Sequence, residues 1–194
     1  MDAKDIILVW DMDQTLLGNR VDSEKLIFND AALHILRAAL EKKSTIFLLT
    51  NNPADIYINR FHIALSYRLR VHHVFDGIMT ATDQDRLLDT SGVPIKHLQD
   101  IKILMDRAGK PFDENTLASR VYFFDDIPYH VLLTELPEGH YVVINPPFEP
   151  AKRDDTDYST IRAALGMSGG SKKKRKQSKK CKRSKKYTRL TQKN

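Results

Sequence analysis

Two carboxylates and a hydroxyl follow a short apolar run near the start of the chain. Residues 6–10 read IILVW, and Asp11, Asp13 and Thr15 follow at alternate positions. A carboxylate can attack phosphorus and form a covalent aspartyl-phosphate. A second carboxylate two residues later can protonate the leaving oxygen and then activate water. The spacing therefore favours phosphoryl transfer, with Asp11 as nucleophile and Asp13 as general acid and base.

A second acidic pair, Asp125 and Asp126, follows another apolar run, VYFF. Four carboxylates at one site repel one another unless some are protonated or a cation neutralises them. Mg²⁺ prefers oxygen ligands and often takes only a few of them from protein. We therefore predict a magnesium site formed by Asp11, Asp13, Asp125 and Asp126. Asp11 and either Asp125 or Asp126 are the natural carboxylate ligands, and a backbone carbonyl near Asp13 can supply another. The cation would also neutralise an incoming phosphate.

A hydroxyl, a backbone segment and a lysine complete the predicted site. Thr50 and Asn51 follow the apolar run IFLL. The Thr50 hydroxyl and the backbone after it can donate hydrogen bonds to phosphate oxygens, and Lys96 can pair with both the nucleophile and the phosphate.

Apolar segments and amphipathic segments alternate along the chain and must position these side chains. Short apolar runs rich in β-branched and aromatic residues predict strands, and apolar residues gathered on one face predict helices. The predicted strands cover 5–10, 44–50, 74–81, 120–126 and 140–147, and the predicted helices cover 29–43, 51–70, 94–109 and 127–136.

Capping residues predict where three of these helices begin or end. Asn29 or Asp30 can cap the first helix, and Asn52 can cap the second with Pro53 at its first helical position. Gly109 is placed to close the third helix.

The alternating order predicts an α/β fold. It favours a three-layer, Rossmann-like open parallel sheet with helices on both faces. In such sheets the functional site lies beyond the carboxyl ends of the strands, where the strand order reverses. Asp11, Thr50 and Asp125 each follow a strand, so we expect their side chains to meet at one rim.

The motifs that carry this chemistry resemble those of the haloacid dehalogenase-like (HAD) phosphohydrolases. DMDQT matches the DxDxT signature of that superfamily, FLLTN resembles its second motif, and FFDD resembles its fourth. Lys96 is most similar to the third-motif lysine, and Lys102 and Lys110 are the alternatives that the resemblance leaves open. The resemblance covers roughly residues 5–146 and implies a HAD-like fold, a Mg²⁺-dependent aspartate nucleophile at Asp11, and Asp13 as acid and base.

Receiver domains also combine an acidic cluster, a threonine and a lysine on a parallel sheet with Mg²⁺. In that family the acid pair follows the first strand and the phosphorylated aspartate follows the third. Here the DMDQT motif follows the first strand and the acid pair comes late in the chain. The order therefore favours the hydrolase.

The lengths between motifs leave no room for a large cap domain. About 28 residues separate Thr15 from Ser44, and about 45 separate Asn51 from Lys96, with residues 82–92 as spare loop. Residues 1–166 are therefore predicted to form one capless catalytic domain with an open site. Such a site can admit a small phosphate ester, a phosphoprotein or a phosphorylated nucleic-acid end.

The formal net charge of +6 hides two oppositely charged regions. Residues 171–194 hold 13 of the 31 basic residues and none of the 25 acidic ones, so residues 1–170 carry 18 basic against 25 acidic side chains, about −7. Residues 167–194 are predicted to form a flexible Gly/Ser hinge and a disordered basic tail. The tail is expected to bind nucleic acid or an acidic partner, or to act as a nuclear localisation signal. The alternative to the enzyme is a non-enzymatic HAD-fold protein that works through this tail.

Composition bears on the compartment and on membranes. No apolar run approaches 18 residues, and no basic segment with a long apolar stretch opens the chain, so we expect neither a membrane span nor a secretory signal. The single cysteine, Cys181, excludes an internal disulfide. This fits an intracellular, reducing compartment.

Overall fold

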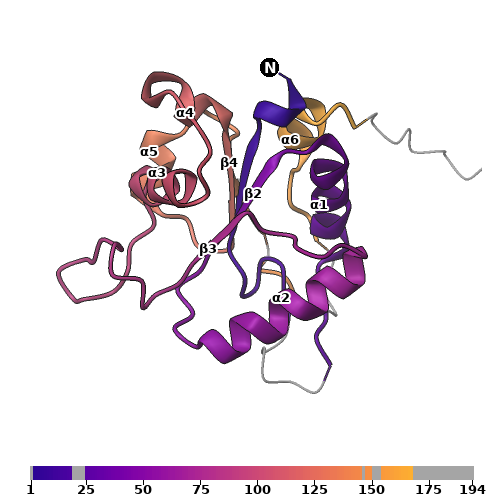
Figure 1. Ribbon diagram of the computed structural model, residues 1–194, viewed down its shortest axis with the longest axis horizontal. Helices are drawn as coiled ribbons and strands as arrows, with labels where there is room; N and C mark the ends of the chain where they lie inside the picture. The colour runs from indigo at the N-terminus through magenta and orange to yellow at the C-terminus, as the bar shows by residue number, and fades with distance from the viewer. Residues whose placement is uncertain (1, 19–24, 146, 150–153, 168–194) are drawn as a thin grey trace, which may run out of the picture.

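The computed structural model of the 194-residue chain describes residues 2–18, 25–145, 147–149 and 154–167 (Figure 1). The strands are β1 (Ile7–Trp10), β2 (Thr45–Leu49), β3 (Gly77–Met79), β4 (Val121–Asp125) and β5 (Tyr141–Val143). The helices are η1 (a 3-10 turn, Ala3–Asp5), α1 (Asp30–Lys42), α2 (Asp55–Leu69), α3 (Leu98–Arg107), α4 (Glu114–Arg120), α5 (His130–Glu135) and α6 (Ser159–Ala164). None of the described helices is long and apolar enough to cross a membrane.

All five strands form one parallel sheet in the order β3-β2-β1-β4-β5. The chain builds outward from β1 to β3 on one side, and then returns to the other side of β1 to add β4 and β5. The strand order therefore reverses between β1 and β4. Trp10 is paired with Phe124 across this seam, so the residues that follow them, Asp11 and Asp125, leave the sheet side by side.

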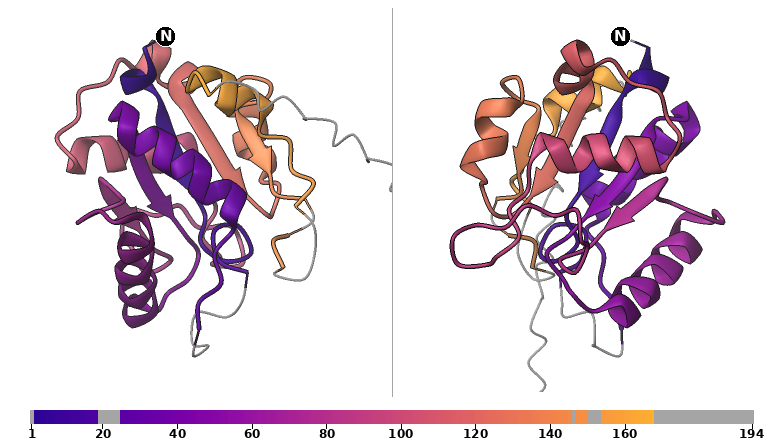
Figure 2. Two further views of the ribbon diagram at one scale, coloured as in Figure 1. Left: turned by 90° about the vertical axis from the view of Figure 1, so that its right-hand side faces the viewer. Right: turned by 60° about the vertical axis from the view of Figure 1, so that its left-hand side comes forward.

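Helices cover both faces of the sheet, as the residues of β1 require. Ile7 and Val9 pack in one apolar cluster with residues of α3, α4 and α5. Leu8 and Trp10 point the other way and pack with α1, α2 and α6. Figures 1 and 2 show these two helical layers on opposite sides of the strands. A strand that is buried on both faces needs an unbroken apolar run, which is what residues 6–10 supply.

The predicted fold class, a three-layer open parallel sheet with helices on both faces, is confirmed. Each predicted strand and helix is present, with shorter bounds. Asn29 is the residue that caps α1, because its Oδ1 accepts hydrogen bonds from the backbone N–H of Ala31 at 3.0 Å and of Ala32 at 3.3 Å. Gly109, with a φ of 62°, follows the end of α3 as predicted.

Two predicted helix starts are wrong. α2 begins at Asp55 with Ala54 as N-cap, since Asn52 and Pro53 form the turn before it. The Asn52 Oδ1 accepts from Ala54 N at 3.0 Å, which closes that turn instead of capping the helix. α3 begins at Leu98, so Lys96 lies in the extended segment that precedes the helix.

Two short helices, α4 and α6, were not predicted. They are 7 and 6 residues long, and helices of that length have little periodic signal. Both still contribute to the core, through Leu117 in α4 and Ile161 in α6, each with none of its surface exposed. Apart from residue 167, the last described residue, the predicted hinge and basic tail lie outside the described residues.

Candidate active site

Polar side chains gather where the strand order reverses, at the carboxyl ends of β1, β2 and β4. Asp11 follows β1, Thr50 follows β2, and Asp125 ends β4. The backbone N–H of Asp11 donates to Phe124 O at 2.9 Å, which fixes the first carboxylate against the β4 seam. The prediction that these residues meet at one rim is confirmed by their shared cavity of about 400 Å³, which they line together with Lys96.

The loop after β1 turns sharply and brings Asp13 into this cavity. Gln14 takes a left-handed conformation, with a φ of 56°. The backbone N–H groups of Leu16 and Leu17 both donate to Met12 O, at 3.0 and 2.9 Å. Thr15 is fully buried and does not face the cavity.

Three of the four predicted metal-binding carboxylates come together. One oxygen each from Asp11, Asp125 and Asp126 lies within 4.8 Å of the others. The Asp13 carboxylate is outside this trio, and its Oδ2 accepts a hydrogen bond from Asn52 Nδ2 at 3.2 Å. The geometry therefore separates a cluster of three carboxylates from a fourth, Asp13, that also lines the cavity.

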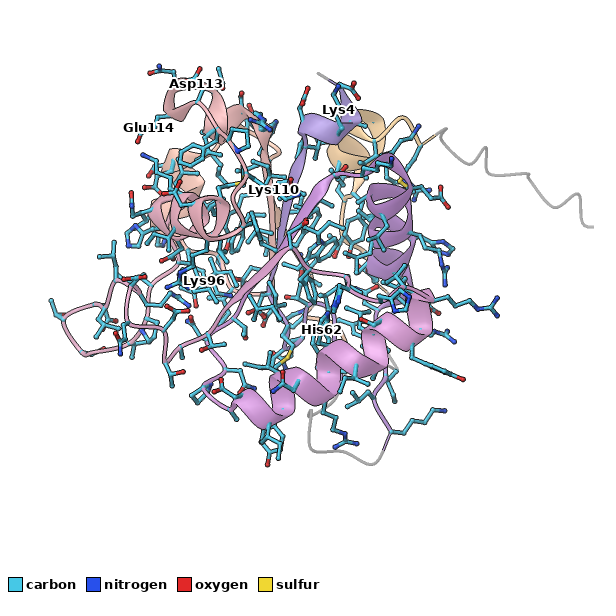
Figure 3. The ribbon with its side chains drawn as sticks, viewed as in Figure 1. Lys4, His62, Lys96, Lys110, Asp113 and Glu114 are labelled. Atoms are coloured by element: carbon cyan, nitrogen blue, oxygen red, sulfur yellow. The ribbon has the colours of Figure 1, made fainter. Side chains whose placement is uncertain are left out.

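Lys96 is the lysine of the site. Its Nζ lies 2.6 Å from Asp11 Oδ1 and 2.6 Å from Asp125 Oδ2. The two alternatives lie elsewhere: Lys102 pairs with Glu114 at 3.2 Å, and Lys110 pairs with Asp76 at 3.0 Å. Figure 3 shows Lys96 and Lys110 at different heights along the sheet, and Lys110 also donates to the Thr45 side chain at the start of β2, at 3.2 Å.

The side chains of Thr50 and Asn51 differ in what they leave available for a ligand. The Thr50 Oγ1 accepts from Asn52 N at 3.1 Å, and a hydroxyl retains its own hydrogen to donate. The Asn51 Nδ2 donates to Pro94 O at 3.0 Å and to Tyr129 OH at 2.9 Å. Both hydrogens of that amide are used, so the prediction that Asn51 binds phosphate rests on its backbone N–H.

Burial shifts the acid–base properties of the site. It raises the pKa of Asp13, and it raises the pKa of Asp126 to about 6, with the charge of Asp11 adding to the effect. Burial alone would lower the pKa of Lys96, but the carboxylates of Asp11 and Asp125 outweigh it and raise that pKa. Lys96 is therefore cationic, and Asp13 is placed to hold a proton at higher pH than an exposed aspartate.

The residues present fit a hard divalent cation. Asp11 and Asp125 are almost fully buried, and together with Asp126 they crowd three carboxylates against one lysine. Burial raises the pKa of Asp126 to about 6, and the negative charge of Asp11 adds to this shift. Oxygen donors at this spacing are those that Mg²⁺ prefers, and the trio of Asp11, Asp125 and Asp126 is the set that would hold it.

Sequence reasoning missed three residues that shape the site. The sequence predicts that Asn52 caps a helix, whereas its Nδ2 donates a hydrogen bond to Asp13 Oδ2. Tyr129 lines the cavity, with its ring centre 5.4 Å from Lys96 Nζ. Arg86 lies in residues 82–92, which are predicted from the sequence to be spare loop. Its side chain is buried there, and its Nη2 donates to Asn51 Oδ1 at 2.8 Å. A single arginine among polar loop residues gives no signal of such a role.

Comparisons with known proteins give only distant likenesses. No protein-family model matches the chain, and no curated protein matches it. Among solved structures, a hypothetical protein from Xanthomonas campestris is 15% identical, with a TM-score of 0.48, covering 86% of this chain and 87% of that one.

Two sugar-phosphate phosphatases are also similar in structure. The 3-deoxy-D-manno-octulosonate 8-phosphate phosphatase from Moraxella catarrhalis, in complex with magnesium, phosphate and KDO, is 17% identical with a TM-score of 0.36, covering 64% of this chain and 60% of that one. The cobalt-bound deoxy-D-mannose-octulosonate 8-phosphate phosphatase from Haemophilus influenzae is 11% identical with a TM-score of 0.37, covering 64% of this chain and 62% of that one. The chain thus spans less than two thirds of each phosphatase.

Proposed function

We propose that this chain is a Mg²⁺-dependent phosphatase of the HAD-like superfamily, acting through an aspartyl-phosphate on Asp11. The observation on which this proposal rests is the contact of one buried lysine, Lys96, with two strand-end carboxylates at 2.6 Å each. One of them, Asp11, also belongs to the three-carboxylate cluster. A nucleophile, a fixed cation and a metal-binding trio then share one cavity.

The chain's own residues can perform both half-reactions. A carboxylate oxygen of Asp11 attacks phosphorus, and the bond to the leaving oxygen breaks as that oxygen takes a proton from Asp13. Asp13, now ionised, then takes a proton from a water molecule that attacks the phosphorus, which releases phosphate and restores Asp11. The raised pKa of Asp13 suits the first step, because the group must begin protonated.

The remaining side chains hold the phosphate and the metal. Lys96 and the Thr50 hydroxyl stabilise negative charge on the phosphate oxygens. Asp11, Asp125 and Asp126 would hold Mg²⁺, which when bound neutralises the phosphate and the charge that develops during transfer.

The surroundings of the cavity support the substrate class that we propose. Within the described residues, no helix or strand lies between β1 and α1, and only α2 and β3 lie between Thr50 and Lys96. No domain in these described segments covers the site. We therefore favour a substrate that can reach an open rim, such as a phosphoprotein segment or a nucleic-acid end, with small esters as the simpler case.

A phosphate-release assay tests this function. Purified chain is incubated with an activated aryl phosphate, a phosphopeptide and 5′- and 3′-phosphorylated oligonucleotides, with Mg²⁺ or with a chelator. We expect release only with Mg²⁺, and none from Asp11→Asn, because an amide is a poor nucleophile and a weaker metal ligand. Normal Mg²⁺-dependent turnover by Asp11→Asn would exclude the aspartyl-phosphate mechanism.

The basic tail is proposed to bind nucleic acid independently of the catalytic domain. The body carries about −7 and residues 171–194 carry +13, so a polyanion should be attracted to the tail alone. If about half of these charges engage, the plot of log K against log[salt] for duplex DNA should slope roughly −5. Truncation after Gly170 should remove this binding and leave ester hydrolysis intact. Duplex binding with a similar slope by the truncated chain would contradict this division.

A further inference from the structure

Arg86 is a buried cation that lies behind the cavity rather than in it. Its side chain has none of its surface exposed. The Nη1 group donates to the carbonyl oxygens of Thr50 at 3.3 Å and Thr80 at 3.4 Å. The Nη2 group donates to Asn51 Oδ1 at 2.8 Å and to Ile95 O at 3.2 Å. Four of its five N–H bonds are therefore directed at defined acceptors.

The fifth N–H faces a buried acid. Arg86 Nε lies 3.6 Å from Asp100 Oδ1, and the Asp100 side chain is only 1% exposed. The other oxygen of Asp100 accepts from His97 N at 2.9 Å, at the start of α3. Burying an ion pair is costly unless its remaining donors and acceptors are satisfied. Here the four N–H bonds on Nη1 and Nη2 are satisfied, whereas Arg86 Nε and Asp100 Oδ1 form an ion pair without a hydrogen bond.

The acceptors of Arg86 belong to the segments that carry the site. Thr50 directly follows β2, Thr80 directly follows β3, and Ile95 directly precedes Lys96. Because the Asn51 oxygen faces Arg86, its amide nitrogen must face Pro94 and Tyr129. One side chain thus sets the spacing between the phosphate-binding end of β2 and the segment that presents Lys96.

We infer that Arg86 is a positioning residue for the proposed phosphatase, holding Thr50, Asn51 and Lys96 in register without touching the substrate. This inference rests on the proposed function for its catalytic consequence, but not for its structural one. Lysine cannot replace the arginine here, because its three donors radiate from a single nitrogen and cannot span four separate acceptors.

The chain offers a matched control in Arg107. Its guanidinium holds the same loop from the outside, through bonds of 2.8 and 2.6 Å to the two oxygens of Asp83. Arg107 does not line the cavity, and neither of its partners, Asp83 and Asp85, does so. Comparing Arg86→Lys with Arg107→Lys therefore separates positioning of the site from general anchoring of the loop.

The first measurement is steady-state kinetics on an activated aryl phosphate with Mg²⁺. Arg86→Lys should lower kcat by about 10- to 100-fold, the effect of a misplacement of about 1 Å, and change KM by less than about threefold. Arg107→Lys should stay within about twofold of the wild type in both constants. Equal kinetics for the two variants would overturn the inference.

The second measurement is backbone hydrogen exchange, which needs no activity. Arg86→Lys should accelerate exchange in residues 50–52 and 94–97, whereas Arg107→Lys should leave those segments unchanged. If Arg86→Lys does not fold, the double variant Arg86→Met with Asp100→Asn removes the donors and leaves no unpaired buried charge; it should show the same exchange pattern. Wild-type exchange in those segments would overturn the inference. If the wild type releases no phosphate from any ester, the proposed function fails, while the exchange result still decides the role of Arg86.

Discussion

Two cations in this protein each lie between two carboxylates, and they differ mainly in exposure. Lys96 contacts Asp11 and Asp125 at 2.6 Å, with side chains that are 2%, 8% and 1% exposed. Arg107 contacts Asp83 at 2.6 Å and Asp85 at 2.5 Å, with side chains that are 41%, 18% and 56% exposed. The contact distances are nearly the same, but the ion pairs of Arg107 are much more exposed to solvent than those of Lys96.

This difference separates an ion pair that joins two surface segments from the buried ion pairs of the proposed active site. Exposed pairs contribute at most about 1 kcal/mol, because water and salt screen them. Buried pairs lose hydration that attraction barely replaces, so stability alone gives little reason to keep them. We interpret the Lys96 centre as one retained for chemistry, and the Arg107 centre as a surface link between the 82–92 loop and α3.

The largest expected effect is that of Lys96→Met. It leaves Asp11 and Asp125 buried without their cation, and removal of one partner from a buried pair costs about 3–5 kcal/mol. Urea unfolding without metal should report that loss, and ester hydrolysis should fall to background. The matched control is Lys110→Met, whose pair with Asp76 is about one-third exposed. A similar unfolding free energy for both variants would contradict the comparison.

An intermediate effect is expected from the metal itself. Mg²⁺ binding to the trio should raise the free energy of unfolding by about 2.7 kcal/mol at a concentration of 100 Kd. Thermal unfolding with Mg²⁺ and with chelator measures this shift. Asp126→Asn should reduce it, and Asp85→Asn, which removes an acid from the exposed centre, should not. An equal shift in both variants would mean that the ion binds elsewhere.

The smallest effect is predicted for Arg107→Ala. Loss of an exposed pair should change the free energy of unfolding by less than about 1 kcal/mol, and the change should shrink further in 1 M salt, where the Debye length is about 3 Å. Unfolding curves at low and high salt test both statements. A loss of several kcal/mol that persists in high salt would show that this centre is not a surface link.

The sequence was sufficient to predict the fold and the part of the site that lies on strands. The unbroken apolar run before Asp11 required a strand buried on both faces, and alternating elements required a parallel sheet. The residues that follow neighbouring parallel strands lie at the same edge of the sheet. For this reason the sequence alone predicts that Asp11, Thr50 and Asp125 lie close together.

Residues on loops could not be predicted in the same way. Arg86 and Tyr129 lie in segments whose path depends on many weak contacts, and neither has a periodic pattern that reveals burial. Lys96 was singled out through the charge that it offers a phosphate and through family resemblance, but its place before α3 was not foreseen. Asparagine is a common helix-capping residue, yet the side-chain amide of Asn52 donates a hydrogen bond to Asp13 instead.

The seam between β1 and β4 has a consequence for how this protein can diversify. Trp10 and Phe124 stack with ring centres 3.8 Å apart and planes 8° from parallel, and each is followed directly by an acid of the site. Strand pairing and aromatic packing thus fix the distance between Asp11, the candidate nucleophile, and Asp125, a candidate metal ligand. Exposed turns such as residues 89–92 can lengthen or change sequence without altering that distance. Under the proposed function, substrate preference can therefore change through such turns while the spacing between Asp11 and Asp125 stays constant.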